Sequence, residues 1–412
     1  MVLTQNTLRN DEEKMTNTEQ PFACDDTYLD YQSAKPVDPR VISKMLPYFN
    51  QQFGNPSSLH GTGDKATNIL DESREVIAKF INAKPNEIIF TSGATESNNL
   101  ALIGYALRNR KKGNHIIISE VEHISIHNIA KYLTRQGFEV SKLPVDSYGQ
   151  IILRKLKARI RPETILISVG YASNEIGTLQ PIKQIGEIAR ENDIAFHVDA
   201  VAAEGLIPID VEKDDIDLLS LSSNDIYGPR GVGALYLRKG YRVNPLIIGG
   251  GQERGLRSGS ENIPGIVGFA EAAKLMMKEM DDEVKTLKQY RDKLNETVLK
   301  QIPKSYINGH PTERLPNNSH FRFEAIEGES ILLSLKDKEI AIATGSACSS
   351  KTLEASHTLI ATGLLHEEAH GSLQVTPGRF TKSEDIDKLI QVLPEVISRL
   401  RKLSPLWKEE EK

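Results

Sequence analysis

Short apolar runs alternate with amphipathic stretches between about residues 70 and 275. The apolar runs are β-prone and lie at 87–92, 115–123, 164–172 and 194–200. Apolar positions with helical spacing follow at 93–110, 125–137 and 182–192. Strands that alternate with helices in this way favour an α/β fold with a mostly parallel sheet covered on both faces. Ligands of such sheets bind at the carboxyl ends of the strands.

A long helical pattern over about 267–300 leads into a second region. Further strand patterns (319–326, 340–344) and helix patterns (331–338, 385–403) follow it and predict a smaller α/β domain. We therefore expect three parts. These are a disordered polar tail (1–24), a large domain (36–280), and a small domain (25–35 with 281–412) that carries the loop around Cys348.

Composition and charge exclude several classes of protein. The net charge of −5 over 412 residues lacks the concentrated positive charge of a nucleic-acid-binding protein. No apolar run approaches the roughly 18 residues of a membrane span. Two cysteines, Cys24 and Cys348, are too few for a disulfide framework and suit a reducing compartment. We expect a cytoplasmic protein without nucleic-acid or membrane partners.

Polar clusters follow several of the predicted strands. Residues 92–95 (Ser-Gly-Ala-Thr) join a strand to a helix, where backbone N–H groups bind an anion or, alternatively, form an ordinary helix cap. Asp199 ends a buried strand and needs a partner such as a protonated heterocyclic nitrogen, or else a salt bridge or a capped turn.

Cys348 lies in a loop of small residues, 345–350. A thiol without bulky neighbours is a candidate nucleophile or metal ligand, and the alternative is a bystander. A second unusual stretch is the polar loop 222–225 between two apolar strands. A loop of this composition often holds a cofactor with the help of a basic residue, but this loop ends in Asp225.

These segments together resemble the cysteine desulfurases of the IscS/NifS-like type, which belong to the fold-type I pyridoxal-phosphate superfamily. The resemblance covers nearly all of 28–407. It is carried by the motifs FGNPSSLH (53–60), FTSGATESNNLA (90–101), HVDA (197–200), GGGQERGLRSGSEN (249–262) and GSACSS (345–350). It implies a large domain with a mostly parallel seven-stranded sheet, a smaller α/β domain, and a homodimer.

The resemblance also implies a pyridoxal phosphate site. Ala94, Thr95 and Ser222 would hold the phosphate, helped by Ser260 of the partner subunit. His123 would stack on the cofactor ring.

Two further residues would contact polar atoms of the ring. Asp199 would pair with the ring nitrogen, and Asn174 would contact the ring hydroxyl. In the family a lysine forms an imine with the cofactor, and the ring then acts as an electron sink. A loop cysteine, here Cys348, takes sulfur from the substrate cysteine, leaving alanine and a persulfide that passes to a scaffold protein.

The sequence departs from the family at the cofactor site. The lysine position is Asp225 and the preceding histidine is Asn224. Ala202 stands for a glutamine, and Gln374 for the arginine that clamps the substrate carboxylate. No protonation state of Asp225 supplies an amine, so it cannot form the imine. Selection for cofactor chemistry therefore looks relaxed, while Cys348 and its loop remain.

Lys35 is a basic residue in a loop that the family places near the substrate. It is either a surface lysine, which we favour, or a replacement for the missing amine.

Three hypotheses follow. The first is an iron–sulfur assembly protein without desulfurase activity, in which Cys348 is a ligand of a [2Fe-2S] cluster shared with an IscU-like scaffold or a sulfur carrier. The second is an active pyridoxal phosphate enzyme, with the cofactor bound non-covalently or through Lys35. The third is a metal site built from Asp199, Asp225 and His123.

Overall fold

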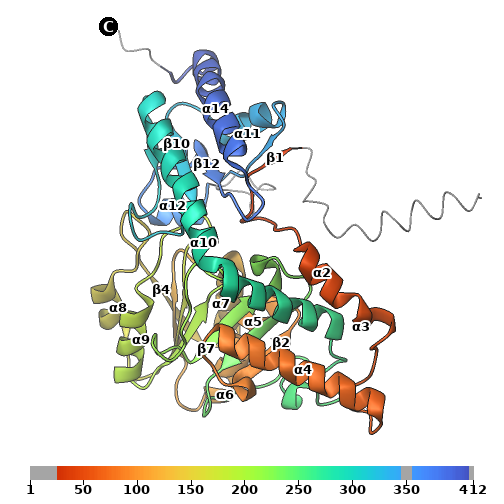
Figure 1. Cartoon of the computed structure of the whole chain (residues 1–412). Helices are drawn as coiled ribbons and strands as arrows, with labels where there is room; N and C mark the ends of the chain where they lie inside the picture. The colour runs from red at the N-terminus through yellow and green to blue at the C-terminus, as the bar shows by residue number, and fades with distance from the viewer. Residues whose placement is uncertain (1–25, 345–354, 408–412) are drawn as a thin grey trace, which may run out of the picture.

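The computed structural model describes residues 26–344 and 355–407. Within these residues, seven strands form one twisted sheet, and five of them run parallel in the centre and at one edge (Figure 1). Along the sheet the strands are β2 (Ile88–Thr91), β8 (Gly233–Leu237), β7 (Leu218–Ser222), β6 (Ala195–Asp199), β5 (Thr164–Gly170), β3 (His115–Ser119) and β4 (Glu139–Leu143). Strand β8 runs opposite to the other six strands of this sheet, so its pairings with β2 and β7 are antiparallel. The predicted α/β fold class is confirmed.

Helices cover both faces of this sheet, because successive side chains of a strand point to opposite sides. Ile117 joins one apolar core, whereas Ile116 and Ile118 join the other. The first core is covered by α4 (Gly61–Phe80), α8 (Leu153–Arg159), α9 (Ile182–Glu191) and α10 (Ile263–Gln301). The second is covered by η2 (Leu100–Gly104), α6 (Tyr105–Asn109) and α7 (Ile124–Arg135), and the short helix α5 (Ala94–Asn99) precedes η2. Burial on both faces explains why the central strands read as nearly continuous apolar runs.

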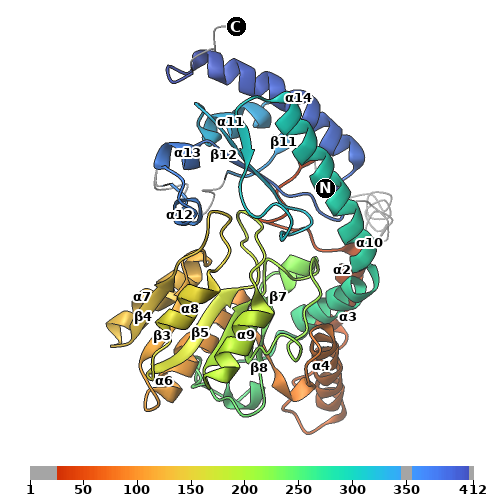
Figure 2. The ribbon, with the colours of Figure 1, turned by 90° about the vertical axis from the view of Figure 1, so that its left-hand side faces the viewer.

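A second layer of structure lies above the large sheet (Figure 2). A three-stranded antiparallel sheet orders β12 (Ser372–Val375), β10 (Ser319–Phe323) and β9 (Ser305–Ile307). Its apolar core is shared with α11 (Gly328–Lys336), α14 (Ser383–Leu403) and the C-terminal half of α10. The remaining helices here are α12 (His357–Ala361) and α13 (His366–His370).

The two parts are joined by α10 and by the N-terminal segment. Strand β1 (Thr27–Tyr28) pairs in parallel with β11 (Ile340–Ala341), and the chain then enters α2 (Pro39–Met45) and α3 (Pro47–Asn50) beside the large sheet. Helix α10 is continuous from 263 to 301 and packs against α2, α4 and α14. The predicted boundary at residue 280 falls inside it and stays a prediction.

Two local features differ from the expected pattern. The predicted helix 93–110 contains a π-helical stretch at η2, which ends at Gly104. A Cβ at Gly104 would lie 2.6 Å from the main-chain oxygen of Asn244, so the missing side chain permits this close packing. Strand β4 was not predicted because its sequence, EVSKL, is mostly polar, as suits the edge of a sheet.

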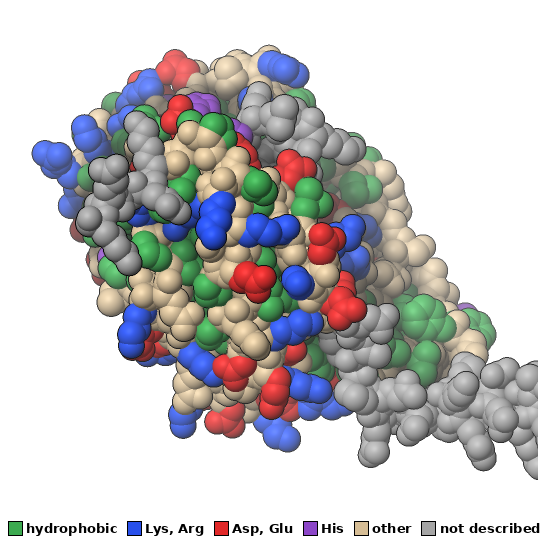
Figure 3. Space-filling view, turned by 90° about the horizontal axis from the view of Figure 1, so that it is seen from above, with side chains coloured by type: hydrophobic (Ala, Val, Ile, Leu, Met, Phe, Trp, Pro, Cys, Tyr) green, Lys and Arg blue, Asp and Glu red, His purple; other side chains and the backbone are tan. Residues whose placement is uncertain are grey.

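Charges are mixed on the face that lies around the small sheet and α14. Basic and acidic side chains are interspersed there without a large field of one sign (Figure 3). No helix in the described part of the chain is long and apolar enough to cross a bilayer.

Candidate functional site

The candidate site lies at the carboxyl ends of β5, β6 and β7. Asp199, the last residue of β6, is aligned with Gly170 at the end of β5 and with Ser220 on β7. The parallel pairing of these strands therefore brings residues from three separate sequence segments to one edge of the sheet, as expected for a ligand site in an open α/β sheet.

Asp199 is buried, with 8% of its surface exposed. One carboxylate oxygen accepts a hydrogen bond from Asn98 Nδ2 (2.7 Å) and the other from the backbone N–H of Val201 (3.2 Å). Burial raises the pKa of Asp199, and the side chain of His123 opposes this increase. No lysine or arginine in the described ranges forms an ion pair with it, so the ordinary salt bridge that we considered is not present there.

His123 caps the start of α7. Its Nδ1 lies 2.8 Å from Ser125 Oγ, and its ring is exposed at the mouth of the site. Thr95 is exposed in the first turn of α5, beside Ala94. Its predicted neighbour in the phosphate site, Ser222, is buried at the end of β7.

The side chains of the polar loop 222–225 form hydrogen bonds with one another. Ser222 Oγ donates to Asn224 Oδ1 (2.8 Å), and Asn224 Nδ2 donates to Asp225 Oδ2 (2.8 Å). Residues 223–226 form the short helix η3 (Ser223–Ile226), and Tyr227 then adopts a left-handed conformation (φ +63°). Burial raises the pKa of Asp225 to about 6, although Lys35 opposes the increase. The residue at the expected lysine position is thus a buried carboxyl group.

Lys35 reaches this same carboxyl end. Its Nζ donates to the main-chain oxygen of Asp225 (2.5 Å) and lies 5.2 Å from the centre of the Tyr227 ring. The side chain is partly buried, so the interpretation as a surface lysine is wrong.

Glu204 is a site residue that the sequence reasoning missed. It is completely buried, and its Oε1 accepts from the backbone N–H of Ser222 (2.7 Å). Its Oε2 has no hydrogen-bond partner, and burial, followed by the charge of Asp225, raises its pKa well above the usual range. A charged residue inside the small-residue run 200–205 was the available signal.

Gln374 directs its side-chain amide nitrogen to the backbone of the loop 174–175. Its Nε2 donates to the main-chain oxygens of Asn174 (2.7 Å) and Glu175 (2.9 Å). The amide therefore positions the loop that carries Asn174, whose predicted contact with the ring hydroxyl stays a prediction.

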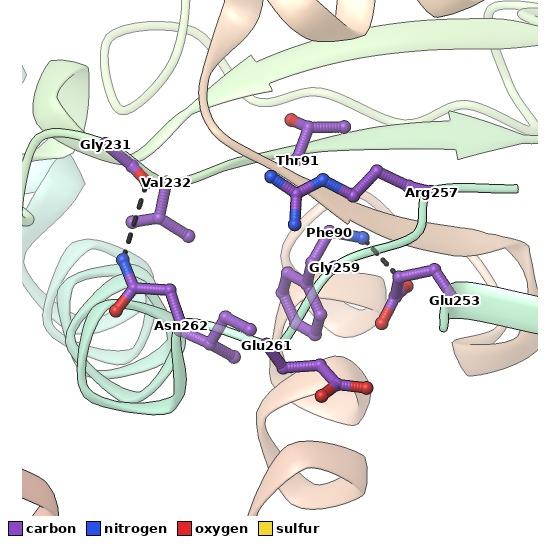
Figure 4. A pocket seen from close by; sticks show the side chains of 10 residues that line it. Phe90, Thr91, Gly231, Val232, Glu253, Arg257, Gly259, Glu261 and Asn262 are labelled. Carbon is purple, nitrogen blue, oxygen red and sulfur yellow. Dashed lines mark hydrogen bonds between the residues drawn. The ribbon is translucent and has the colours of Figure 1, made fainter. Parts of the chain in front are cut away.

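Ser260 is exposed and lies in the segment 253–262 that borders a small pocket at the end of β2 (Figure 4). Arg257 points toward this pocket, and its Nε donates to Glu96 Oε1 on α5 (3.0 Å). This pair holds the segment close to Thr95. The assignment of Ser260 to the phosphate site of the partner subunit stays a prediction.

Cys348 lies outside the described residues, and so does Cys24. The chain on either side of 345–354 is placed at the site. Ala343 pairs with Gln374, while Ser356 Oγ donates to Glu175 Oε2 (2.6 Å). His357 Nε2 lies 2.9 Å from the main-chain oxygen of Glu122.

The residues present fit part of a pyridoxal phosphate site. Asp199 is a buried carboxylate without a cationic side chain, as a partner of a protonated ring nitrogen would be. The neighbouring Asn98 Oδ1 is buried without a partner. Residue 225 is an aspartate, which offers no amine, so an imine with the cofactor would need the amine of another residue. As for the third hypothesis, no group of three or more metal-binding side chains occurs within the described residues.

Glu122 leads to a prediction of pH-dependent stability. Burial raises its pKa from 4.5 to about 8, so this group is protonated in the folded chain and ionised in the unfolded chain between these values. The unfolded state then binds fewer protons, and stability falls as pH rises, by up to about 1.4 kcal/mol per pH unit. Burial raises the pKa of Glu175 only to about 7. Between pH 7 and 8, we therefore expect Glu122→Gln to remove about 1 kcal/mol of this loss.

Urea denaturation at pH 7 and pH 8 measures the effect. The matched control is Glu120→Gln, which changes a less buried carboxyl two residues earlier and should keep the wild-type slope. Equal slopes for all three proteins would show that Glu122 is already ionised at pH 7.

The chain is similar to known proteins over most of its length. The aminotransferase class-V family matches residues 27–389. "Cysteine desulfurase IscS 1" of Archaeoglobus fulgidus is 57% identical over 92% of this chain and 99% of its own length. "Cysteine desulfurase IscS" of Methanosarcina thermophila is 51% identical over 93% of this chain and 95% of its own length. A solved "NifS-like protein" superposes with a TM-score of 0.85 at 35% identity, covering 91% of this chain and all of that one.

Proposed function

Because this chain belongs to the aminotransferase class-V family, among the IscS/NifS-like cysteine desulfurases, we propose that it acts in iron–sulfur cluster assembly through Cys348, without pyridoxal-phosphate-dependent desulfurase activity. Desulfurases of this type work as dimers that deliver sulfur to scaffold proteins. In the proposal, this chain forms a cytoplasmic homodimer and docks an IscU-like scaffold.

The observation that carries the proposal is the carboxyl group of Asp225. It is buried, it accepts from Asn224, and Glu204 lies in the same charge network. Asp225 thus occupies the position where the family uses an amine, and a second acid, Glu204, interacts with it. Pyridoxal phosphate supplies an electron sink when it is bound. Here the chain holds no lysine at residue 225 to form or release a covalent link, and Gln374 is engaged by the backbone.

The proposal assigns the chemical role to the retained thiol of Cys348. The segment that contains Cys348 starts after Thr344 and returns at Ala355, and the described residues around both ends contact the site. A thiolate is a suitable ligand for iron in a [2Fe-2S] cluster. Cys348 then completes the coordination of a cluster on the scaffold, whose sulfide arises elsewhere. As a sulfur carrier, it would instead accept the outer sulfur of a donor persulfide, which leaves as a thiol, and pass that sulfur to the scaffold.

Cluster assembly with a Cys348 variant tests this function. The full-length protein is mixed anaerobically with an IscU-like scaffold, ferric iron and sulfide, and the cluster is followed by absorption and by iron content after gel filtration. We expect Cys348→Ser to lose most of the cluster that co-elutes with the wild-type complex. Cys24→Ser is the matched control and should retain it. If Cys348→Ser holds as much cluster as the wild type, the proposal is wrong.

An active desulfurase is the second candidate function. The observation that favours it is the contact between Lys35 and Asp225, because it places an amine beside the position of the missing lysine. Release of alanine from cysteine separates the two candidates.

A further inference from the structure

Lys35 has no role in the proposed cluster chemistry, yet the fold positions it closely. It lies in the segment between β1 and α2, which runs beside η3, since the backbone N–H of Asp38 also donates to the main-chain oxygen of Tyr227 (2.9 Å). The Nζ of Lys35 is held between the main-chain oxygen of Asp225 and the face of the Tyr227 ring. A long flexible side chain is therefore fixed at its reactive end.

Burial makes the amine of Lys35 chemically available. Burial lowers the pKa of Lys35 from its usual value, while Asp225, Glu283 and Glu204 partly oppose the decrease. A partly buried lysine with a lowered pKa exposes a neutral, nucleophilic amine more often than a surface lysine does. The nearby carboxyl groups can also accept and return protons.

The same charge network links Lys35 to Asp199. Lys35 interacts electrostatically with Asp225 and Glu204, and both of these interact with Asp199. Lys35 and Asp199 therefore belong to one network of interacting charges. In pyridoxal phosphate the aldehyde carbon lies opposite the ring nitrogen. A ring whose nitrogen faces Asp199 directs its aldehyde away from that carboxylate, toward the side on which an amine is required.

We propose that Lys35 is the covalent anchor of this pocket and that its Nζ forms an imine with the aldehyde of pyridoxal phosphate in place of a lysine at residue 225. The nitrogen lone pair adds to the carbonyl carbon, a C=N bond replaces C=O, and the oxygen leaves as water with the two amine protons. The step needs no oxidant or reductant. The main-chain oxygen of Asp225 accepts a hydrogen bond from this amine and holds it in place.

This inference goes beyond the proposed function, which needs no cofactor. The anchored ring would be a structural ligand that stabilises the folded chain by mass action. It would not bring about desulfuration, because Asn224, Ala202 and Gln374 replace the groups that the family resemblance assigns to substrate and ring.

Reductive trapping tests the anchor directly. The full-length protein is incubated with pyridoxal phosphate, reduced with borohydride, digested, and mapped by mass spectrometry. We expect a phosphopyridoxyl group on the peptide that contains Lys35, approaching one per chain, and an imine absorption band before reduction. Lys35→Arg keeps the positive charge but should lose both signals. Lys44→Arg, at an exposed lysine on α2, should keep both.

Two further measurements guard against a folding artefact. Lys35→Met is compared with Lys35→Arg, and the denaturation midpoint of each unliganded variant shows whether it folds. Pyridoxine phosphate, which lacks the aldehyde, should stabilise wild type and Lys35→Arg equally, whereas pyridoxal phosphate should stabilise the wild type more. An adduct confined to surface lysines, or one unchanged in a folded Lys35→Arg protein, overturns the proposal. Neither result bears on cluster retention by Cys348, so the two proposals fail separately.

Discussion

Incubated with L-cysteine and pyridoxal phosphate, the wild-type protein is expected to release no L-alanine above a heat-denatured control. In the family, the lysine is both the covalent link to the cofactor and a positioned amine. Asp225 supplies neither in any protonation state. Loss of positioned proton transfer alone reduces rates by about 10²–10⁴-fold, so turnover should fall at least that far below a desulfurase that has the lysine. Chromatographic measurement of alanine over time gives the rate.

The control for this prediction is Asp225→Asn, which keeps the size of the side chain and also lacks an amine. It should be as inactive as the wild type. Lys35→Arg belongs in the same assay, because an active enzyme that uses Lys35 would lose its activity in that variant. Alanine release by the wild type at a rate typical of a desulfurase would reject the proposed function and favour the second candidate.

A large loss of stability is expected for Arg379→Met. Arg379 Nε donates to Glu283 Oε2 on α10, and Nη1 donates to Asp38 Oδ2 at the start of α2, both at 2.9 Å. Its guanidinium carbon lies 4.4 Å from the centre of the Tyr227 ring. The two acidic side chains are 8% and 2% exposed, so removing the cation leaves buried negative charge. Breaking such a pair costs about 3–5 kcal/mol.

Urea denaturation measures this loss. The figure should lie near the lower end of that range, because Asp38 keeps its bonds to Arg40 and Glu283 still accepts from Tyr227. The matched control is Arg161→Met, which removes an ion pair with Glu139 whose two side chains are about half exposed. That change should cost less than about 1 kcal/mol. Similar losses for the two variants would mean that the Arg379 cluster does not hold the two parts of the chain together.

The fold was predictable because its signal is local and repeated. The runs around Ile88, Ile117 and Leu166 are apolar at almost every position, and helical spacing follows each of them, as burial on both faces of a parallel sheet requires. Edge strand β4 was not predicted from the apolar pattern because one of its faces meets solvent and carries polar residues. The π-helical stretch at η2 escaped because a contact with a distant segment, near Asn244, accompanies it.

The candidate site was predictable only where a residue type stands out at the end of an element. Asp199 and Asp225 met that condition, because Asp199 is an acid that follows an apolar strand and Asp225 is an acid in the polar loop 222–225. Glu204 did not, since only tertiary burial distinguishes it from a solvated side chain. Cys348 remains a prediction from the sequence, because its loop lies outside the described residues.

The sequence by itself determined the alternation of strands and helices and the absence of a lysine at residue 225, because both depend only on which residue follows which. Only the tertiary structure decided where the side-chain amine of Lys35 lies. Residue 35 lies 190 positions from Asp225 in the chain, and they meet because β1 pairs with β11 and the following segment passes beside η3. Contacts of such separation depend on how the two parts of the chain pack, and local spacing carries no record of that packing.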